Sequence, residues 1–145
     1  MDVQVEIVRE ASAELVAGFA RLLPQLSGSA KPLDLAAVDR IVRCGTNTVL
    51  VARADGEIVG TLTLVQIPVP SGLRARIEDV VVDGAARGHG VAGLLMGEAV
   101  RLARESGART VDLTSRPDRV SANRLYEGLG FGPRESTVYR MYLDG

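Results

Sequence analysis

A loop rich in glycine follows a short valine run near the middle of the chain, in a pattern suited to binding phosphate. A stretch with helical periodicity, residues 91–106, comes directly after the loop. Glycine has no Cβ, so a ligand can approach the loop backbone closely. The first amides of a helix lack partners within it and lie at its positive dipole end. We therefore expect a phosphate or diphosphate site here, with an ordinary surface turn as the alternative. The loop residues concerned are Arg87, Gly88, Gly90 and Gly93.

Two adjacent carboxylates, Glu78 and Asp79, come just before the valine run. In a regular strand their side chains point to opposite faces of the sheet. A carboxylate in an otherwise apolar strand is costly to bury unless it is paired. At least one of them should therefore face a polar cleft or a partner, where it can remove a proton or bind a cation. A salt bridge to Arg74 or Arg76 is the structural alternative.

The hydrophobic pattern predicts the element order β-α-α-β-β-β-α-β-α-β-β. We expect a single α/β domain over residues 1–145, with a mixed, mostly antiparallel sheet flanked by helices. Asp55-Gly56 is a strong hairpin signal, and Pro24 should kink or end the first helix. The expected strands are 3–8, 48–54, 57–67, 74–82, 110–114, a segment beginning at Phe131, and 136–143; the expected helices begin after Ser12, at 35, at 91 and at 119.

Composition narrows the class of protein. The 145 residues suit one domain, and a net charge of −1 gives no basic field for nucleic acid. Cys44 is the one cysteine and cannot form an internal disulfide. There is no secretory signal, and no apolar run approaches the ~20 residues needed to cross a bilayer. We expect a cytoplasmic protein. One histidine and one cysteine, far apart, predict no metal site.

The literal spacing Gly88-x-Gly90-x-x-Gly93 also matches the dinucleotide-binding fingerprint. Asp112 lies about 20 residues beyond it, where that fingerprint has an acid. However, this loop follows three antiparallel strands, and too little chain remains after the helix for a doubly wound sheet. A Walker A lysine is absent. A nicotinamide-dependent oxidoreductase is therefore a rival that the glycines permit and the topology opposes.

Two motifs resemble those of one family. Residues 87–92, Arg-Gly-His-Gly-Val-Ala, resemble the Gln/Arg-x-x-Gly-x-Gly/Ala loop of the GCN5-related N-acetyltransferases (GNAT). Residues 122–131 are similar to that family's second landmark, Asn-x-x-(x)-Tyr-x-x-x-Gly-Phe. The spacing of the motifs and the element order resemble the acyl-CoA N-acyltransferase fold over nearly the whole chain.

The resemblance implies acetyl-coenzyme A as co-substrate, with its diphosphate on the amides of residues 87–92. It also implies that the main chain of Val80 and Val82 pairs with the pantetheine arm like an added strand. Tyr126 would then be the general acid for the leaving thiolate, with packing of its helix onto the core beside Leu125 and Leu129 as the structural alternative. Glu78 or Asp79 would be the general base. His89 is expected near the diphosphate and not as the base. The cofactor-binding residues so implied are Val80, Val81, Val82, Arg87, Gly88, His89, Gly90, Val91, Ala92, Gly93, Asn123 and Tyr126.

The expected activity is transfer of acetyl to a primary amine of a small molecule or peptide, by direct attack in a ternary complex. No nucleophile for a covalent intermediate stands out. The resemblance places the acceptor between the N-terminal helices and residues 66–73 and 136–139, and it makes a homodimer through 136–143 possible. Arg116, Arg119 and Arg124 are expected to form a solvated basic face. The alternatives are a non-catalytic acyl-CoA-binding regulatory module and an interaction domain that binds no cofactor.

Overall fold

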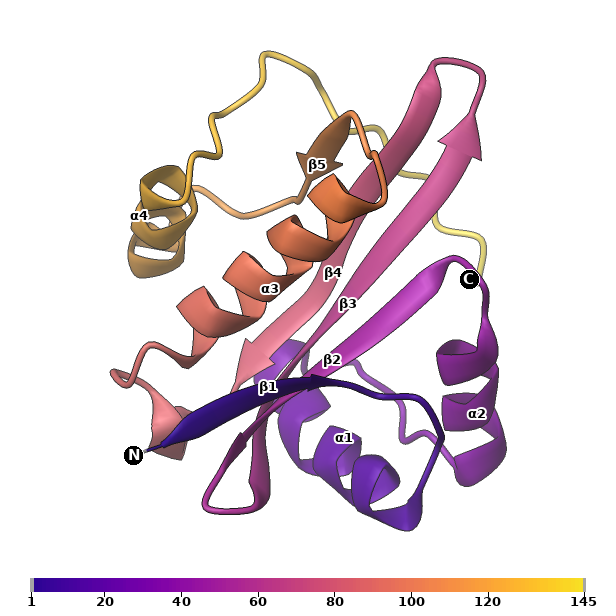
Figure 1. Ribbon diagram of the computed structural model, residues 1–145, viewed down its shortest axis with the longest axis vertical. Helices are drawn as coiled ribbons and strands as arrows, with labels where there is room; N and C mark the ends of the chain where they lie inside the picture. Colours follow the sequence, from indigo (N-terminus) through magenta and orange to yellow (C-terminus); the bar gives the residue numbers. More distant parts are fainter. Residues whose placement is uncertain (1, 145) are drawn as a thin grey trace. The chain divides into compact units, whose positions relative to one another are not determined.

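Figure 1 shows the computed structural model of the chain, which describes residues 2–144. The chain divides into two compact units, Met1–Thr114 and Ser115–Gly145. We name them the N-terminal unit and the C-terminal unit and describe each by itself. That the whole chain forms a single domain stays a prediction.

A five-stranded sheet is the centre of the N-terminal unit, and its strand order is β1-β2-β3-β4-β5. The first four strands form an antiparallel meander, and β5 pairs with β4 in parallel. Asp55 and Gly56 both have positive φ in the turn between β2 and β3, as the hairpin signal predicts. The mixed, mostly antiparallel sheet is thus confirmed. The strands are β1 (Val3–Ile7), β2 (Asn47–Ala54), β3 (Glu57–Val69), β4 (Gly72–Val82) and β5 (Thr110–Asp112).

Three helices of four residues or more accompany the sheet: α1 (Ala13–Leu26), α2 (Leu35–Arg43) and α3 (Val91–Glu105). Ser12 caps α1 through the amide of Leu15, and Asp34 caps α2 through the amide of Ala37. Pro24 does not end α1 where it stands, because α1 continues to Leu26. At the last turn the missing proline amide removes one helical hydrogen bond, which the rest of a 14-residue helix tolerates.

The helices bury the two faces of the sheet. On one face, α1 and α2 enclose a core that contains Phe19, Val38 and Val51. On the other face α3 lies against β3, where it is drawn in orange in front of the sheet (Figure 1). Gly60 of β3 permits this close approach, because a Cβ there would lie 3.2 Å from side-chain atoms of both Leu95 and Val91. The start of α3 is thereby seated directly on the sheet.

The C-terminal unit contains one helix, α4 (Val120–Gly128), among its described residues. The tyrosine ring of Tyr126 meets Phe131 edge to face, with centroids 6.4 Å apart. The two strands expected from Phe131 onward are not formed in residues 131–144, so this part of the predicted order is wrong. Val138, for example, is 69% exposed and Leu143 89% exposed. A strand forms only when a neighbour accepts its ladder hydrogen bonds and one face is buried, and this segment has neither.

Across residues 2–144, no helix has the length and apolar character that crossing a membrane would require.

Candidate functional site

Strand β4 contains a β-bulge close to its C-terminal end. Thr63 of β3 pairs with Glu78, whereas Thr61 pairs with Val81, so one residue of β3 opposes two of β4. The additional residue, Asp79, has φ 52°, in the left-handed region that side chains other than glycine seldom occupy. Bulges and such backbone conformations gather next to functional sites, where they redirect a side chain.

The bulge gives the two adjacent carboxylates different environments. Glu78 accepts a hydrogen bond from Arg76, with Nε and Oε1 2.9 Å apart, so it has the ion pair that the sequence offered as an alternative. Asp79 makes no salt bridge within residues 2–144. Partial desolvation, and then the nearby charge of Glu78, raise the pKa of the Asp79 carboxyl. Of the two carboxylates, Asp79 is therefore the one that has no ion pair in the described chain and that holds a proton more tightly than an ordinary aspartate.

The second half of β4 also has an open edge. The ladder between β4 and β5 joins Arg74–Arg76 to Thr110–Asp112 and goes no further. From Glu78 to Val82, β4 thus has no strand beside it on that edge within the described part of the N-terminal unit. An extended ligand that contains amides can hydrogen-bond to such an edge as an added strand.

The loop after β4 begins with a single turn of 3-10 helix, Gly84–Ala86, which Asp83 caps through the amide of Ala85. Gly88 and Gly90 then adopt φ of 83° and 75°, so the chain turns twice through the left-handed region. The residues from Arg87 to Gly90 are exposed. His89 lies in this exposed stretch, as the sequence predicts for a side chain at the surface.

Helix α3 starts without a capping side chain, since its N-cap is Gly90. The first helical hydrogen bond runs from the Leu94 amide to the Gly90 carbonyl, at 3.1 Å. The amides of residues 91–93 therefore have no protein partner within residues 2–144. A Cβ placed on Gly88 or Gly90 would meet no atom within 4 Å, so the space beside these amides is open. The chemistry of this junction fits a phosphate or diphosphate group.

Helix α1 contacts the beginning of the same loop, which the sequence did not predict. The Gly84 amide donates to Oε1 of Gln25 at 2.9 Å, and Nε of Arg21 lies 3.4 Å from Oδ2 of Asp83. A second nitrogen of the Arg21 guanidinium donates to the carbonyl of Ile58. Both α1 side chains lie on the exposed side of an amphipathic helix, where sequence patterns carry no signal of a specific contact.

The remaining predicted site residues, Asn123 and Tyr126, lie on α4 of the C-terminal unit. The Asn123 side chain closes the segment before the helix: its Oδ1 accepts from Ser115 Oγ at 2.6 Å, and its Nδ2 donates to the Arg116 carbonyl at 3.0 Å. Spacing of three residues places Asn123 and Tyr126 on neighbouring positions of one helix face. Their parts in cofactor binding and catalysis stay predictions.

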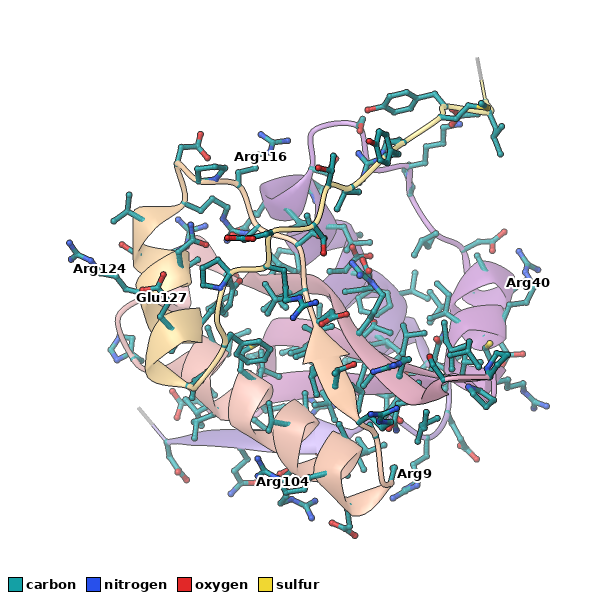
Figure 2. The ribbon with its side chains drawn as sticks, turned by 90° about the horizontal axis from the view of Figure 1, so that it is seen from above. Arg9, Arg40, Arg104, Arg116, Arg124 and Glu127 are labelled. Carbon is teal, nitrogen blue, oxygen red and sulfur yellow. The ribbon has the colours of Figure 1, made fainter. Side chains whose placement is uncertain are left out.

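The arginines of this unit are exposed, as expected for a solvated basic face. Figure 2 shows Arg116 on the segment before α4 and Arg124 projecting from the helix, with Glu127 on the same helix. The acidic side chain interrupts the basic face.

Comparison with known proteins identifies the chain by family. The model of the acetyltransferase (GNAT) family matches residues 14–131. A transcriptional regulator from Bacillus halodurans C-125 has 30% sequence identity and a TM-score of 0.79, over 96% of this chain and 100% of that chain. An acetyltransferase from Trypanosoma brucei has 28% identity and a TM-score of 0.79, over 98% of this chain and 100% of that chain.

The fold is also shared with more distant enzymes. AAC(6')-Iy, solved in complex with the bisubstrate analogue CoA-S-monomethyl-acetylneamine, has 19% identity and a TM-score of 0.80, over 99% of each chain. The family match spans the phosphate loop, the bulged strand and α4 together. This chain therefore belongs to the acetyltransferase (GNAT) family.

Proposed function

We propose that the protein transfers the acetyl group of acetyl-coenzyme A to a primary amine, by direct attack in a ternary complex. One observation carries the proposal: an unpaired stretch of β4, a loop with two left-handed glycines and an uncapped helix start follow one another without interruption. Together they offer a backbone edge for an extended amide chain and free amides for a diphosphate.

The co-substrate would be held mainly by the backbone of the N-terminal unit. The main chain of Val80 and Val82 would bind the pantetheine amides, and the amides of residues 87–93 the diphosphate. Asn123 and Tyr126 of α4 would add side-chain contacts. Because most of these contacts come from main-chain groups, the glycines matter for the space that they leave open.

Two side chains would move protons during the transfer. The amine nitrogen forms a bond to the acetyl carbon while the bond from that carbon to sulfur breaks. Asp79 would accept the proton that the amine loses, since its raised pKa gives it more affinity for a proton than an ordinary aspartate has. Tyr126 would give its phenolic proton to the sulfur. Glu78, which forms an ion pair with Arg76, would contribute only through its negative charge.

The acceptor is proposed to be a small-molecule or peptide amine. The match to AAC(6')-Iy, whose structure contains an acetylneamine derivative, supports a small-molecule amine. A ribosomal-protein-alanine N-acetyltransferase from Brucella melitensis shares the fold at a TM-score of 0.77 and supports a peptide amine. A homodimer through residues 136–143 is proposed on the exposed apolar side chains there, among them Met141 at 81% exposure.

A second candidate function is a regulatory module that binds an acyl-coenzyme A without catalysis. The relative at 30% identity is a transcriptional regulator, which favours this reading. The two functions share the cofactor site and differ in whether Tyr126 has a chemical task.

The variant Tyr126→Phe separates them. If Tyr126 is the general acid, kcat should fall roughly 100-fold, because one step of acid catalysis is lost, while the Kd for acetyl-coenzyme A changes little. Tyr142→Phe is the matched control, since the side chain of Tyr142 is 75% exposed and the substitution removes the same hydroxyl group at another position. Release of free thiol over a panel of amines is the readout. Unchanged turnover in Tyr126→Phe would remove the acid role.

The first test of the whole proposal is calorimetric titration with acetyl-coenzyme A, with NADH and NADPH alongside. Binding of acetyl-coenzyme A alone is expected. Binding of a nicotinamide cofactor alone, or of none of the three by folded protein, would overturn the proposed function.

A further inference from the structure

The loop that follows β4 is connected at its start to helix α1 by a hydrogen bond from Gly84 to Gln25 and by an ion pair between Arg21 and Asp83. The Gln25 amide group is oriented at both ends: Nε2 donates to the Arg21 carbonyl at 3.2 Å, and Oε1 accepts from the Gly84 amide at 2.9 Å. Gly84 is the first residue of the single 3-10 turn that leads into Arg87. Its amide therefore has a side-chain partner at the point where β4 ends.

Arg21 adds a second connection at the same point. Its guanidinium faces Asp83 at 3.4 Å and donates to the Ile58 carbonyl at the start of β3. Asp83 in turn donates its amide to the Val59 carbonyl at 2.8 Å and caps the 3-10 turn. The last residue before the loop is thus held from α1 and from β3 together.

The loop itself has few other restraints. Ala86 is buried and its amide bonds to the Asp83 carbonyl, but Arg87 to Gly90 are exposed and two of these residues are glycines. A loop of this composition has many accessible conformations, and ordering it costs conformational entropy. If the loop became ordered only when the ligand binds, the apparent affinity would be reduced. It would fall in proportion to the fraction of molecules whose loop is already in the binding conformation.

We propose that Gln25, supported by Arg21, is a positioning residue for the co-substrate: it holds the loop in its diphosphate-binding conformation before the ligand arrives. The inference rests on the proposed function for the identity of the ligand. The hydrogen bonds of the Gln25 side chain within residues 2–144 go to Arg21 and Gly84 and not to the free amides of residues 91–93, so its effect passes through Gly84. Helix α1 thereby controls the affinity of a site to which it contributes no binding group.

The test uses Gln25→Met, which keeps the length of the side chain and removes the oxygen that accepts from Gly84. We expect the Kd for acetyl-coenzyme A to rise about 3- to 10-fold, with kcat at saturating co-substrate unchanged. Hydrogen exchange of the amides from Gly84 to Gly90 should become faster in the free protein, while the Tm stays close to that of the wild type. Gln4→Met on β1 is the matched control, since Gln4 is exposed and makes no side-chain hydrogen bond within residues 2–144.

Rescue distinguishes positioning from a loss of packing. Gln25→Glu keeps an acceptor oxygen for the Gly84 amide and should retain loop protection that Gln25→Met loses. Wild-type affinity together with unchanged exchange in Gln25→Met would overturn the inference. If the wild type itself fails to bind acetyl-coenzyme A, the proposed function falls, and the exchange measurement still decides whether Gln25 orders the loop.

Discussion

The two halves of β4 differ in their neighbours and in their backbone geometry, although they belong to one strand. Arg74–Arg76 in the first half pair with β3 on one side and with β5 on the other, and Ala75 and Ile77 are buried. The second half, residues 78–82, has a strand beside it on one side only and contains the bulge at Asp79. The first half is built like the interior of a sheet, and the second like a sheet edge.

The second half of β4 contains two features that are energetically unfavourable. A left-handed residue other than glycine is unfavourable within a strand, and a partly desolvated carboxylate next to another carboxylate is unfavourable too. Both occur at Asp79, and neither is relieved by a partner in the described chain. Features that cost stability and persist at one residue point to a function for that residue.

The largest effect is expected from Asp79→Asn in the second half. Loss of the proton acceptor should lower kcat/KM by roughly 100- to 10,000-fold. The raised pKa means that the folded protein holds this proton more tightly than the unfolded chain does. The stability so gained is present at low pH and is lost as pH rises through the raised pKa, so the variant should be slightly more stable than the wild type at neutral pH.

Asp55→Asn is the matched control, because Asp55 has the same φ of 52° in the β2–β3 turn. It should retain full activity. In the wild type, kcat/KM should fall as pH drops through the raised pKa of Asp79, at a pH above the range of an ordinary aspartate. Full activity in Asp79→Asn would contradict a catalytic role for the second half of β4.

In the first half, Ile77→Ala should act on stability. Ile77 is 3% exposed, and its truncation leaves a cavity, so the free energy of unfolding should fall by about 2–5 kcal/mol. The Kd for acetyl-coenzyme A of the folded variant should change little. Ile67→Ala, at a side chain that is 41% exposed, should cost less than about 1 kcal/mol in the same denaturant titration. A stable Ile77→Ala protein with weakened binding would reverse the assignment of the two halves.

A smaller effect, on binding alone, is expected from Gly90→Val beyond the end of β4. The valine side chain would occupy the open space before the amides of α3. Valine would also be strained in the backbone conformation of Gly90, whose φ is 75°. Affinity for acetyl-coenzyme A should fall at least about 10-fold by calorimetry. Gly97→Val places the same side chain on the exposed surface of α3, where a Cβ meets no atom within 4 Å. Normal affinity in Gly90→Val would discredit the loop as the diphosphate site.

Much of the fold was accessible from the sequence because local signals and burial agree there. The Asp55-Gly56 turn and the helices that begin after Ser12, at residue 35 and at Val91 are each confirmed. The final strands were not, because apolar residues alone cannot show whether a neighbouring strand exists to accept their hydrogen bonds. Apolar side chains at 138–139 and 141–143 lack the strict alternation that would bury one face.

The backbone geometry of the candidate site could be predicted from the sequence, whereas its side-chain contacts could not. Glycine is favoured where the backbone needs positive φ, so Gly88 and Gly90 could be identified from the sequence as turning points of the loop. Whether Glu78 or Asp79 carries the free carboxylate depends on a bulge, and a bulge is a property of two strands in register. The contact from Gln25 to Gly84 joins residues 59 positions apart and has no periodic signature.

Gly60 has a consequence for the recognition of a long ligand. Its missing side chain lets Val91, the first residue of α3, rest on the sheet beside the last residues of β4. The distance between the edge of β4 and the amides at the start of α3 therefore depends on how closely Val91 packs against Gly60. A methyl group at position 60 would require side-chain atoms of Val91 and Leu95 and the Val81 carbonyl to shift by a few tenths of an ångström. In the proposed site, such a shift would change the spacing that a bound co-substrate has to bridge.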